Sequence, residues 1–374
     1  MTTKPLARPI AIVALVALAG CVPKSSIPVV SIGAVLTLTG SSAQWGIAPR
    51  DALLMAADEI NARGGISHRK VELHIEDDQC QPATAVSATQ KILAAHKPLA
   101  IVGAICSSAT LAVAPIAERD HVVLISPAST NPQITNSGDY IFRTIPSDAF
   151  RGKVFAEYVF SQGHKRVSVL YINNDGGAGN QQSFSENFRA LGGAIASVDA
   201  YPADAQDLRA QLSKIKQQDS DAVLVVSYPG DTPLVLRQAF ELGLRKPLFF
   251  QTEALDDPAV LAKAGKAANG VTYILPAQAE GSAAQTFSQN YKTRYLRDPE
   301  LFAAEGYDSL MLIAKALENV SDPTPDTLKA ALYKIQNYPG ASGTISFDAN
   351  GDVSKPMVVK RIENGRSIVV RTAQ

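Results

Sequence analysis

The sequence predicts an α/β fold made of two doubly wound lobes, each built on a parallel sheet with helices on both faces. Two observations lead to this prediction. Short apolar runs typical of strands alternate with amphipathic helical stretches along most of the chain, which is the pattern of parallel sheets with right-handed crossovers. The alternation also begins again near the middle of the chain, and 374 residues suffice for two domains with separate cores.

The first series of predicted elements contains strands that are apolar on every residue. Such continuous runs are expected where helices cover both faces of a sheet. The glycine pair Gly64-Gly65 is expected to end the helix before it. The predicted strands are 29–36, 71–76, 99–105, 122–126 and 140–143, and the predicted helices are 48–62, 83–95 and 109–118.

The second series repeats the same alternation. Joints are expected at Thr144–Asp148, around Leu275–Pro276 and after Gly351, so that three hinge crossings connect two lobes that are discontinuous in sequence. Two independent α/β domains in series remain the alternative. The predicted strands are 167–172, 195–201, 222–227, 248–251 and 271–275, and the predicted helices are 181–191, 206–217, 232–242, 283–295 and 302–319. The expected lobes comprise 28–146 with 276–355, and 147–275 with 356–374.

The N-terminus is typical of an export signal. A short region with basic residues precedes the apolar run 10–19, which is shorter than the roughly 20 residues needed to span a bilayer. The run ends in Leu18-Ala19-Gly20-Cys21, which resembles the bacterial lipobox. The sequence therefore predicts a cleaved signal over 1–20 and a tether over 21–27 that is lipidated at Cys21. An ordinary signal peptide that contains a cysteine is the alternative.

Charge and cysteine content narrow the class of protein further. The formal net charge is zero, which argues against a nucleic-acid binder. The chain has three cysteines, and lipidation of Cys21 leaves Cys80 and Cys106 as a pair for which an oxidising compartment favours a disulfide. Two unpaired buried thiols are the alternative.

Polar side chains follow the predicted strands, where open α/β sheets bind ligands. Ser107 and Ser108 stand between a strand and a helix N-terminus, and Thr130 follows the next strand. In the second half, Tyr228 and Glu253 follow strands. Hydroxyls on one half and a carboxylate on the other suit a zwitterion, although helix capping explains serine and threonine at such positions equally well.

A connected series of motifs carries a family resemblance. The motifs are Leu38-Thr39-Gly40 before Trp45-Gly46, Asp58-Glu59-Ile60-Asn61-Ala62-Arg63-Gly64-Gly65-Ile66, Asp77-Asp78-Gln79-Cys80, Cys106-Ser107-Ser108-Ala109-Thr110, Ser126-Pro127-Ala128-Ser129-Thr130 and Tyr307-Asp308-Ser309-Leu310. From about residue 27 to 370 the chain resembles the periplasmic leucine/isoleucine/valine-binding proteins, the solute receptors of branched-chain amino acid ABC transporters with the type I periplasmic binding fold.

The resemblance implies a ligand site between the lobes. By position, Ser107, the Ala128 backbone and Thr130 match the groups that hold the ligand carboxylate. Glu253 and Tyr228 match the groups that receive the ammonium. These matches imply an amino acid or close analogue as ligand and hinge closure around it.

Three further positions carry over from the family. Trp45 matches an aromatic residue that covers the ligand side chain, and Cys80 and Cys106 match the family disulfide. Gly176 departs from the pattern, because relatives commonly carry an aromatic residue there that lines the pocket. This departure predicts a roomier pocket that tolerates larger or different side chains.

Enzyme chemistry finds little support in the sequence. The five histidines have no metal-ligand spacing, and no nucleophile elbow is present. We therefore expect no catalysis, metal or cofactor. The predicted function is a lipid-anchored solute receptor on the periplasmic or cell-envelope face of a bacterial membrane, with a permease as partner and no nucleic acid. A regulatory or scaffold lipoprotein that uses the same fold for protein contacts is the alternative.

Overall fold

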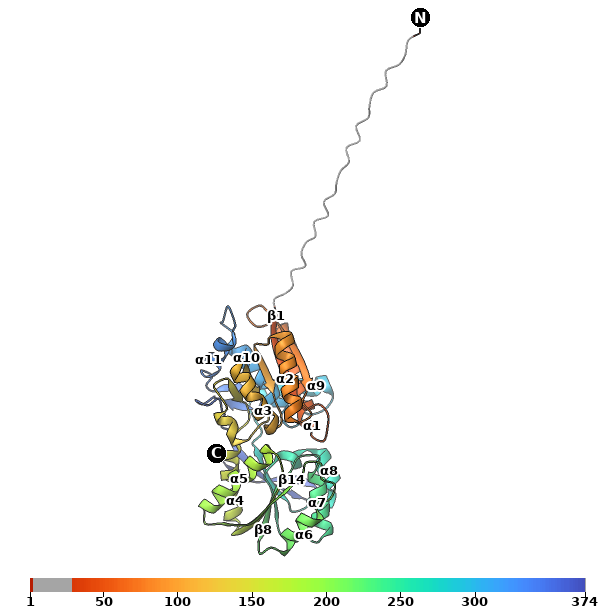
Figure 1. Ribbon diagram of the computed structural model, residues 1–374, viewed down its shortest axis with the longest axis vertical. Coiled ribbons are helices and arrows are strands. Elements are labelled where there is room, and N and C mark those ends of the chain that lie inside the picture. The colour runs from red at the N-terminus through yellow and green to blue at the C-terminus, as the bar shows by residue number, and fades with distance from the viewer. Residues whose placement is uncertain (3–28, 374) are drawn as a thin grey trace.

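The computed structural model describes residues 1–2 and 29–373, and residues 29–373 form two lobes, one above the other in Figure 1. The predicted signal, Cys21 and the tether lie outside the described residues. Each lobe is an α/β unit built around its own sheet. The chain passes from the first lobe to the second, returns to the first and ends in the second.

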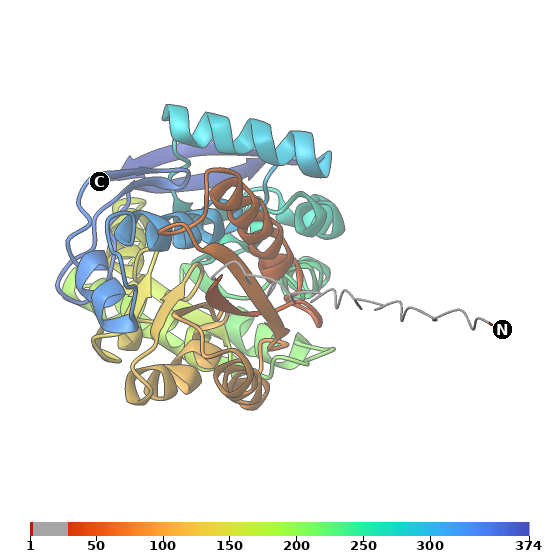
Figure 2. The ribbon, with the colours of Figure 1, turned by 90° about the horizontal axis from the view of Figure 1, so that it is seen from above.

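The first lobe contains a parallel sheet in the order β2-β1-β3-β4-β5. Alternate residues of its central strands enter separate cores: Val102 packs with α1 and α10 on one face, and Ile101 packs with α2 and α3 on the other. Figure 2 shows these helices on both sides of the sheet. The elements are β1 Val29–Leu36, α1 Gln44–Ala62, β2 Lys70–Asp77, α2 Pro82–His96, β3 Ala100–Gly103, α3 Ser107–Arg119, β4 Val123–Ser126, β5 Ile141–Arg143, α9 Ser282–Tyr295, α10 Ala303–Ala316, α11 Pro325–Leu332, β11 Tyr338–Gly340 and β12 Gly343–Ile345.

The second lobe repeats this topology. Its parallel strands follow the order β7-β6-β8-β9-β10, and β13 and β14 extend the sheet as antiparallel strands beside β10. The elements are α4 Asp148–Ser161, β6 Arg166–Ile172, α5 Asp175–Ala190, β7 Ala194–Tyr201, α6 Arg209–Gln217, β8 Ala222–Val226, α7 Thr232–Glu241, β9 Leu248–Phe250, α8 Pro258–Ala264, β10 Thr272–Pro276, β13 Met357–Glu363 and β14 Arg366–Ala373.

The predicted fold class is confirmed, with additions. Every strand and helix predicted from the sequence overlaps an observed one, while α4, α8, α11 and β11 to β14 were not predicted. In the second lobe the parallel sheet is extended by two antiparallel strands, β13 and β14, which the sequence did not predict. α5 begins at Asp175 instead of residue 181, since the Asn174 side chain caps it by accepting a hydrogen bond from the amide of Gly177 at 2.8 Å.

Candidate functional site

The six predicted ligand-binding residues lie at or just beyond the carboxyl ends of the strands, where the two sheets face each other. In both lobes the strand order reverses beside the first strand, which creates the crevice where such sheets bind ligands. Five parts of the chain carry them: Trp45 lies in the first turn of α1, α3 begins with Ser107, the loop after β4 carries Ala128 and Thr130, Tyr228 follows β8, and a 3-10 turn over Glu253–Asp256 follows β9.

Ser107 fastens the loop after β4 to the start of α3. Its Oγ accepts hydrogen bonds from the backbone amides of Thr130 and Asn131, each at 3.2 Å. The helix start is anchored in turn, because Cys80 and Cys106 form a disulfide. Among the described residues the Ser107 hydroxyl has no acceptor for its own proton, so that proton can be donated to an anion in the cleft.

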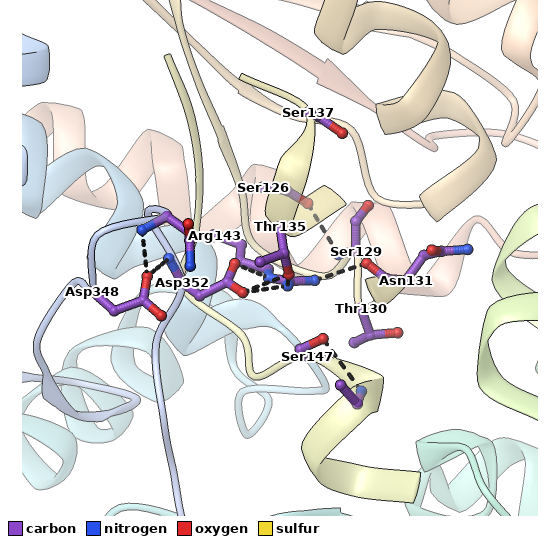
Figure 3. A network of polar contacts seen from close by, with 12 residues as sticks. Ser126, Ser129, Thr130, Asn131, Thr135, Ser137, Arg143, Ser147, Asp348 and Asp352 are labelled. Carbon is purple, nitrogen blue, oxygen red and sulfur yellow. Dashed lines mark hydrogen bonds and ion pairs between the residues drawn. The ribbon is translucent and has the colours of Figure 1, made fainter. Parts of the chain in front are cut away.

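Thr130 connects this loop to the beginning of the second lobe. Its hydroxyl donates to Oδ2 of Asp148 at 2.7 Å, and the Asp148 amide donates to the Thr130 carbonyl at 2.8 Å. Figure 3 shows Thr130 between its loop and the start of α4. Ala128, in the same loop, is also buried. The sequence did not identify Asp148, which is buried at the first hinge crossing.

Glu253 lies in a buried cluster of charges in the second lobe. Its Oε1 contacts Nη2 of Arg151, whose Nε lies 3.4 Å from Oδ1 of Asp148. Burial raises the pKa of Asp148, and the nearby Arg151 and Thr130 only partly oppose this rise. Burial lowers the pKa of Arg151, but the Glu253 and Asp148 carboxylates outweigh it and the net shift is upward.

Trp45 and Tyr228 meet across the cleft. Their ring centroids are 4.8 Å apart and their planes are tilted by 60°. The Tyr228 hydroxyl lies 3.4 Å from Oδ1 of Asn174, and a Cβ atom at Gly176 would overlap the Tyr228 hydroxyl oxygen. Gly176 therefore makes room for Tyr228, which occupies part of the space that the sequence assigned to a larger pocket.

Further contacts hold the lobes together around this site. Nε2 of Gln44 donates to Oδ2 of Asp257 at 3.0 Å, and Nδ2 of Asn131 donates to the Asp175 carbonyl at 2.5 Å. Beside these contacts lies a cavity of about 710 Å³ that both lobes line. It is lined by Ser41 and Pro229, which neighbour the Trp45–Tyr228 pair, but not by Ser107, Thr130 or Glu253.

Arg143, which the sequence analysis also missed, supports the site from the hinge. It is wholly buried and donates to both carboxylate oxygens of Asp352 and, at 3.0 Å, to the Asn131 carbonyl (Figure 3). Arg143 thereby positions the loop that carries Thr130. The sequence feature that could have identified Arg143 was its position immediately before the predicted joint at residue 144.

Within 1–2 and 29–373, no group of three or more histidine, cysteine, aspartate or glutamate side chains is arranged to hold a metal ion. In that same part of the chain, no helix has both the length and the apolar character needed to cross a membrane.

Comparisons with known proteins show the family to which the chain belongs. Residues 29–366 match the family model described as periplasmic binding protein. The leucine-, isoleucine-, valine-, threonine- and alanine-binding protein of Pseudomonas aeruginosa is 30% identical over 84% of this chain and 85% of its own length.

Solved structures share the fold over nearly the whole chain. A leucine-binding protein from Thermotoga maritima superposes with a TM-score of 0.86 and 30% identity, covering 92% of this chain and 99% of its own. A branched-chain amino acid transporter substrate-binding protein from Streptococcus pneumoniae, in complex with isoleucine, gives a TM-score of 0.82 at 30% identity, with the same coverage of 92% and 99%.

Proposed function

Because the chain belongs to the periplasmic binding protein family, we propose that it captures an amino acid or close analogue between its lobes and delivers it to an ABC importer. The observation that carries the proposal is that hydroxyls and amides follow strands of the first lobe, while the Glu253 carboxylate follows β9 of the second. A zwitterion complements both sides. The names of the matched relatives, which list leucine, isoleucine, valine, threonine and alanine, support the same ligand class.

In this proposal Ser107 and the Ala128 amide receive the ligand carboxylate, and Thr130 joins them when its hydroxyl proton turns from Asp148 to the ligand. Ser107 is suited to this role because two backbone amides orient its oxygen and leave its proton to be donated. Glu253 and Tyr228 receive the ammonium. Charge-assisted hydrogen bonds of this kind are needed because burying either charge without a partner is costly.

Closure of the hinge couples binding to transport. Ligand contacts drawn from both lobes favour the form in which the lobes meet, so the ligand shifts the equilibrium towards it. The Trp45–Tyr228 and Gln44–Asp257 contacts connect the two lobes. Periplasmic binding proteins are the standard example of such hinge closure. A permease can then recognise the shape of the closed receptor.

We further propose that Cys21 is lipidated and anchors the receptor to the outer face of a bacterial membrane. The lipobox-like segment Leu18-Ala19-Gly20-Cys21 supports this assignment. The proposed division of the mature chain is 28–146 with 276–355 for the first lobe and 147–275 with 356–374 for the second. Replacement of Cys21 by serine should move the protein from the membrane fraction to the soluble fraction.

A thermal-shift screen of the mature, unlipidated protein against the standard amino acids and related small acids tests the proposal. A compound at 100 times its Kd stabilises the folded state by about 2.7 kcal/mol. Ser107→Ala should abolish the shift, whereas Ser108→Ala, at the neighbouring buried serine, should preserve it. A scaffold protein would show no shift with any compound, and that result would contradict the proposal.

A further inference from the structure

Arg151 is a buried cation in contact with Glu253, the residue proposed to receive the ligand's amine. Its side chain, on the first turn of α4, is 1% exposed, and Glu253, which it contacts, is 5% exposed. Its Nη1 lies 3.4 Å from the Gln251 carbonyl at the end of β9. The guanidinium is therefore fixed to the strand that presents Glu253.

This ion pair weakens the preference of the proposed subsite for a positively charged group on the ligand. A guanidinium in contact with Glu253 cancels much of the field that the carboxylate would exert on a ligand cation. Asp148 shares the same guanidinium, with its Oδ1 3.4 Å from Nε, so Arg151 partly neutralises both carboxylates next to the proposed subsite. Glu253 remains a hydrogen-bond acceptor, but its charge already has a partner.

We propose that Arg151 determines specificity by supplying the positive charge that the ligand would otherwise bring, so that the cleft accepts amine-free carboxylates as well as α-amino acids. A 2-hydroxy acid has the required chemistry: its carboxylate meets Ser107, and its hydroxyl donates to Glu253 in place of the ammonium. This inference rests on the proposed function, because it assumes that Glu253 faces the α-substituent of a bound carboxylate.

Isothermal titration with L-leucine and with 2-hydroxy-4-methylpentanoate, its hydroxy analogue, tests the inference. The wild-type protein should bind the two acids with Kd values within about tenfold of each other. Arg151→Gln should change the ratio of the two Kd values by about tenfold or more in favour of leucine. A tenfold change corresponds to the lower end of the coupling energies measured between close charge pairs. Arg151→Lys keeps the charge and should leave the ratio within about threefold of wild type.

The ratio of the two Kd values distinguishes a role of Arg151 in specificity from a purely structural role. A variant that weakens both acids equally, or a lysine variant that behaves like the glutamine variant, would overturn the inference. If Arg151→Gln does not fold, the ratio of the two Kd values in the wild type and in Arg151→Lys tests the inference instead. A wild-type preference for leucine above about 1000-fold would then overturn the inference. Failure of every amino acid and small acid in the thermal-shift screen would overturn the proposed function itself, whereas binding of leucine alone would overturn only this inference.

Discussion

Arg143 and Asp352 form a doubly hydrogen-bonded ion pair between residues 209 positions apart, with both nitrogen–oxygen distances at 2.6 Å. Arg143 ends β5, immediately before the first hinge crossing, and Asp352 precedes the third. The pair therefore joins two of the segments that connect the lobes. It also acts on the cleft, because the same guanidinium holds the carbonyl of Asn131.

Removal of Asp352 should be strongly destabilising. Arg143 is 0% exposed, so Asp352→Ala leaves a buried cation without its counter-ion, at a cost of about 3–5 kcal/mol in unfolding free energy. Urea denaturation measures this loss. Asp120→Ala is the matched control, because the Arg119–Asp120 pair is solvent-exposed and should contribute less than about 1 kcal/mol. If both variants lost the same unfolding free energy, the Arg143–Asp352 pair would contribute no more to stability than an exposed ion pair.

Gly176 and Tyr228 should behave as a coupled pair. A Cβ atom at position 176 would overlap the Tyr228 hydroxyl oxygen, so Gly176→Ala should destabilise the protein by about 1–3 kcal/mol through overpacking. In a Tyr228→Phe background the same substitution should cost less, because the colliding oxygen is gone. A double-mutant cycle of unfolding free energies gives the coupling. Additive effects would mean that Tyr228 moves aside without cost.

The disulfide should contribute to stability through the loop it closes. Cys80 and Cys106 are 26 residues apart, and the chain-entropy model gives about 3.5 kcal/mol for a loop of that size. The double variant Cys80→Ser/Cys106→Ser should lose roughly this much in urea denaturation. It should also bind ligand more weakly, since Cys106 immediately precedes Ser107. Unchanged affinity would indicate that α3 holds Ser107 in place without the bond.

Asp231 should make stability depend on pH. Burial raises the pKa of Asp231 from 3.8 to about 6 in the folded protein, although hydrogen bonds from Tyr201 and the Tyr228 amide oppose the rise. Between these values the folded state holds a proton that the unfolded state has released. The proton bound to Asp231 therefore stabilises the folded protein below pH 4, and this stabilisation is lost as the pH rises through 6. Its loss lowers the unfolding free energy by about 3 kcal/mol.

Asp231→Asn isolates this contribution. The variant cannot titrate at this position, so its unfolding free energy should fall less steeply than that of the wild type between pH 4 and pH 6. Urea denaturation at several pH values measures both slopes. Parallel curves would mean that Asp231 titrates alike in the folded and unfolded chains.

Sequence patterns predicted the elements whose burial follows a simple rule. β3 and β4 are buried at every residue and almost entirely apolar, because helices cover both faces of their sheet. α4 was missed for the opposite reason: its first turn buries Asp148 and Arg151, and buried charges disrupt the apolar periodicity that indicates a helix. Their i, i+3 spacing, which places opposite charges on one helix face, was the remaining signal.

The candidate site was predictable in its loops but not in its partners. Ligand residues after strands follow from the topology of doubly wound sheets. The bond from Thr130 to Asp148 and the contact of Arg151 with Glu253 depend on how distant segments pack, since Arg151 and Glu253 are 102 residues apart. A local sequence pattern cannot show that two residues so far apart in the chain are in contact.

The position of β13 has a consequence for how the second lobe is assembled. This strand pairs along the whole of β10, from Thr272 with Arg361 to Pro276 with Met357, yet the segment between them belongs to the other lobe. A nascent chain that stops short of residue 357 therefore leaves β10 as an open sheet edge able to recruit strands from other molecules. Chains cut between the lobes at this third crossing should consequently aggregate, and a synthetic peptide covering β13 and β14 should suppress that aggregation.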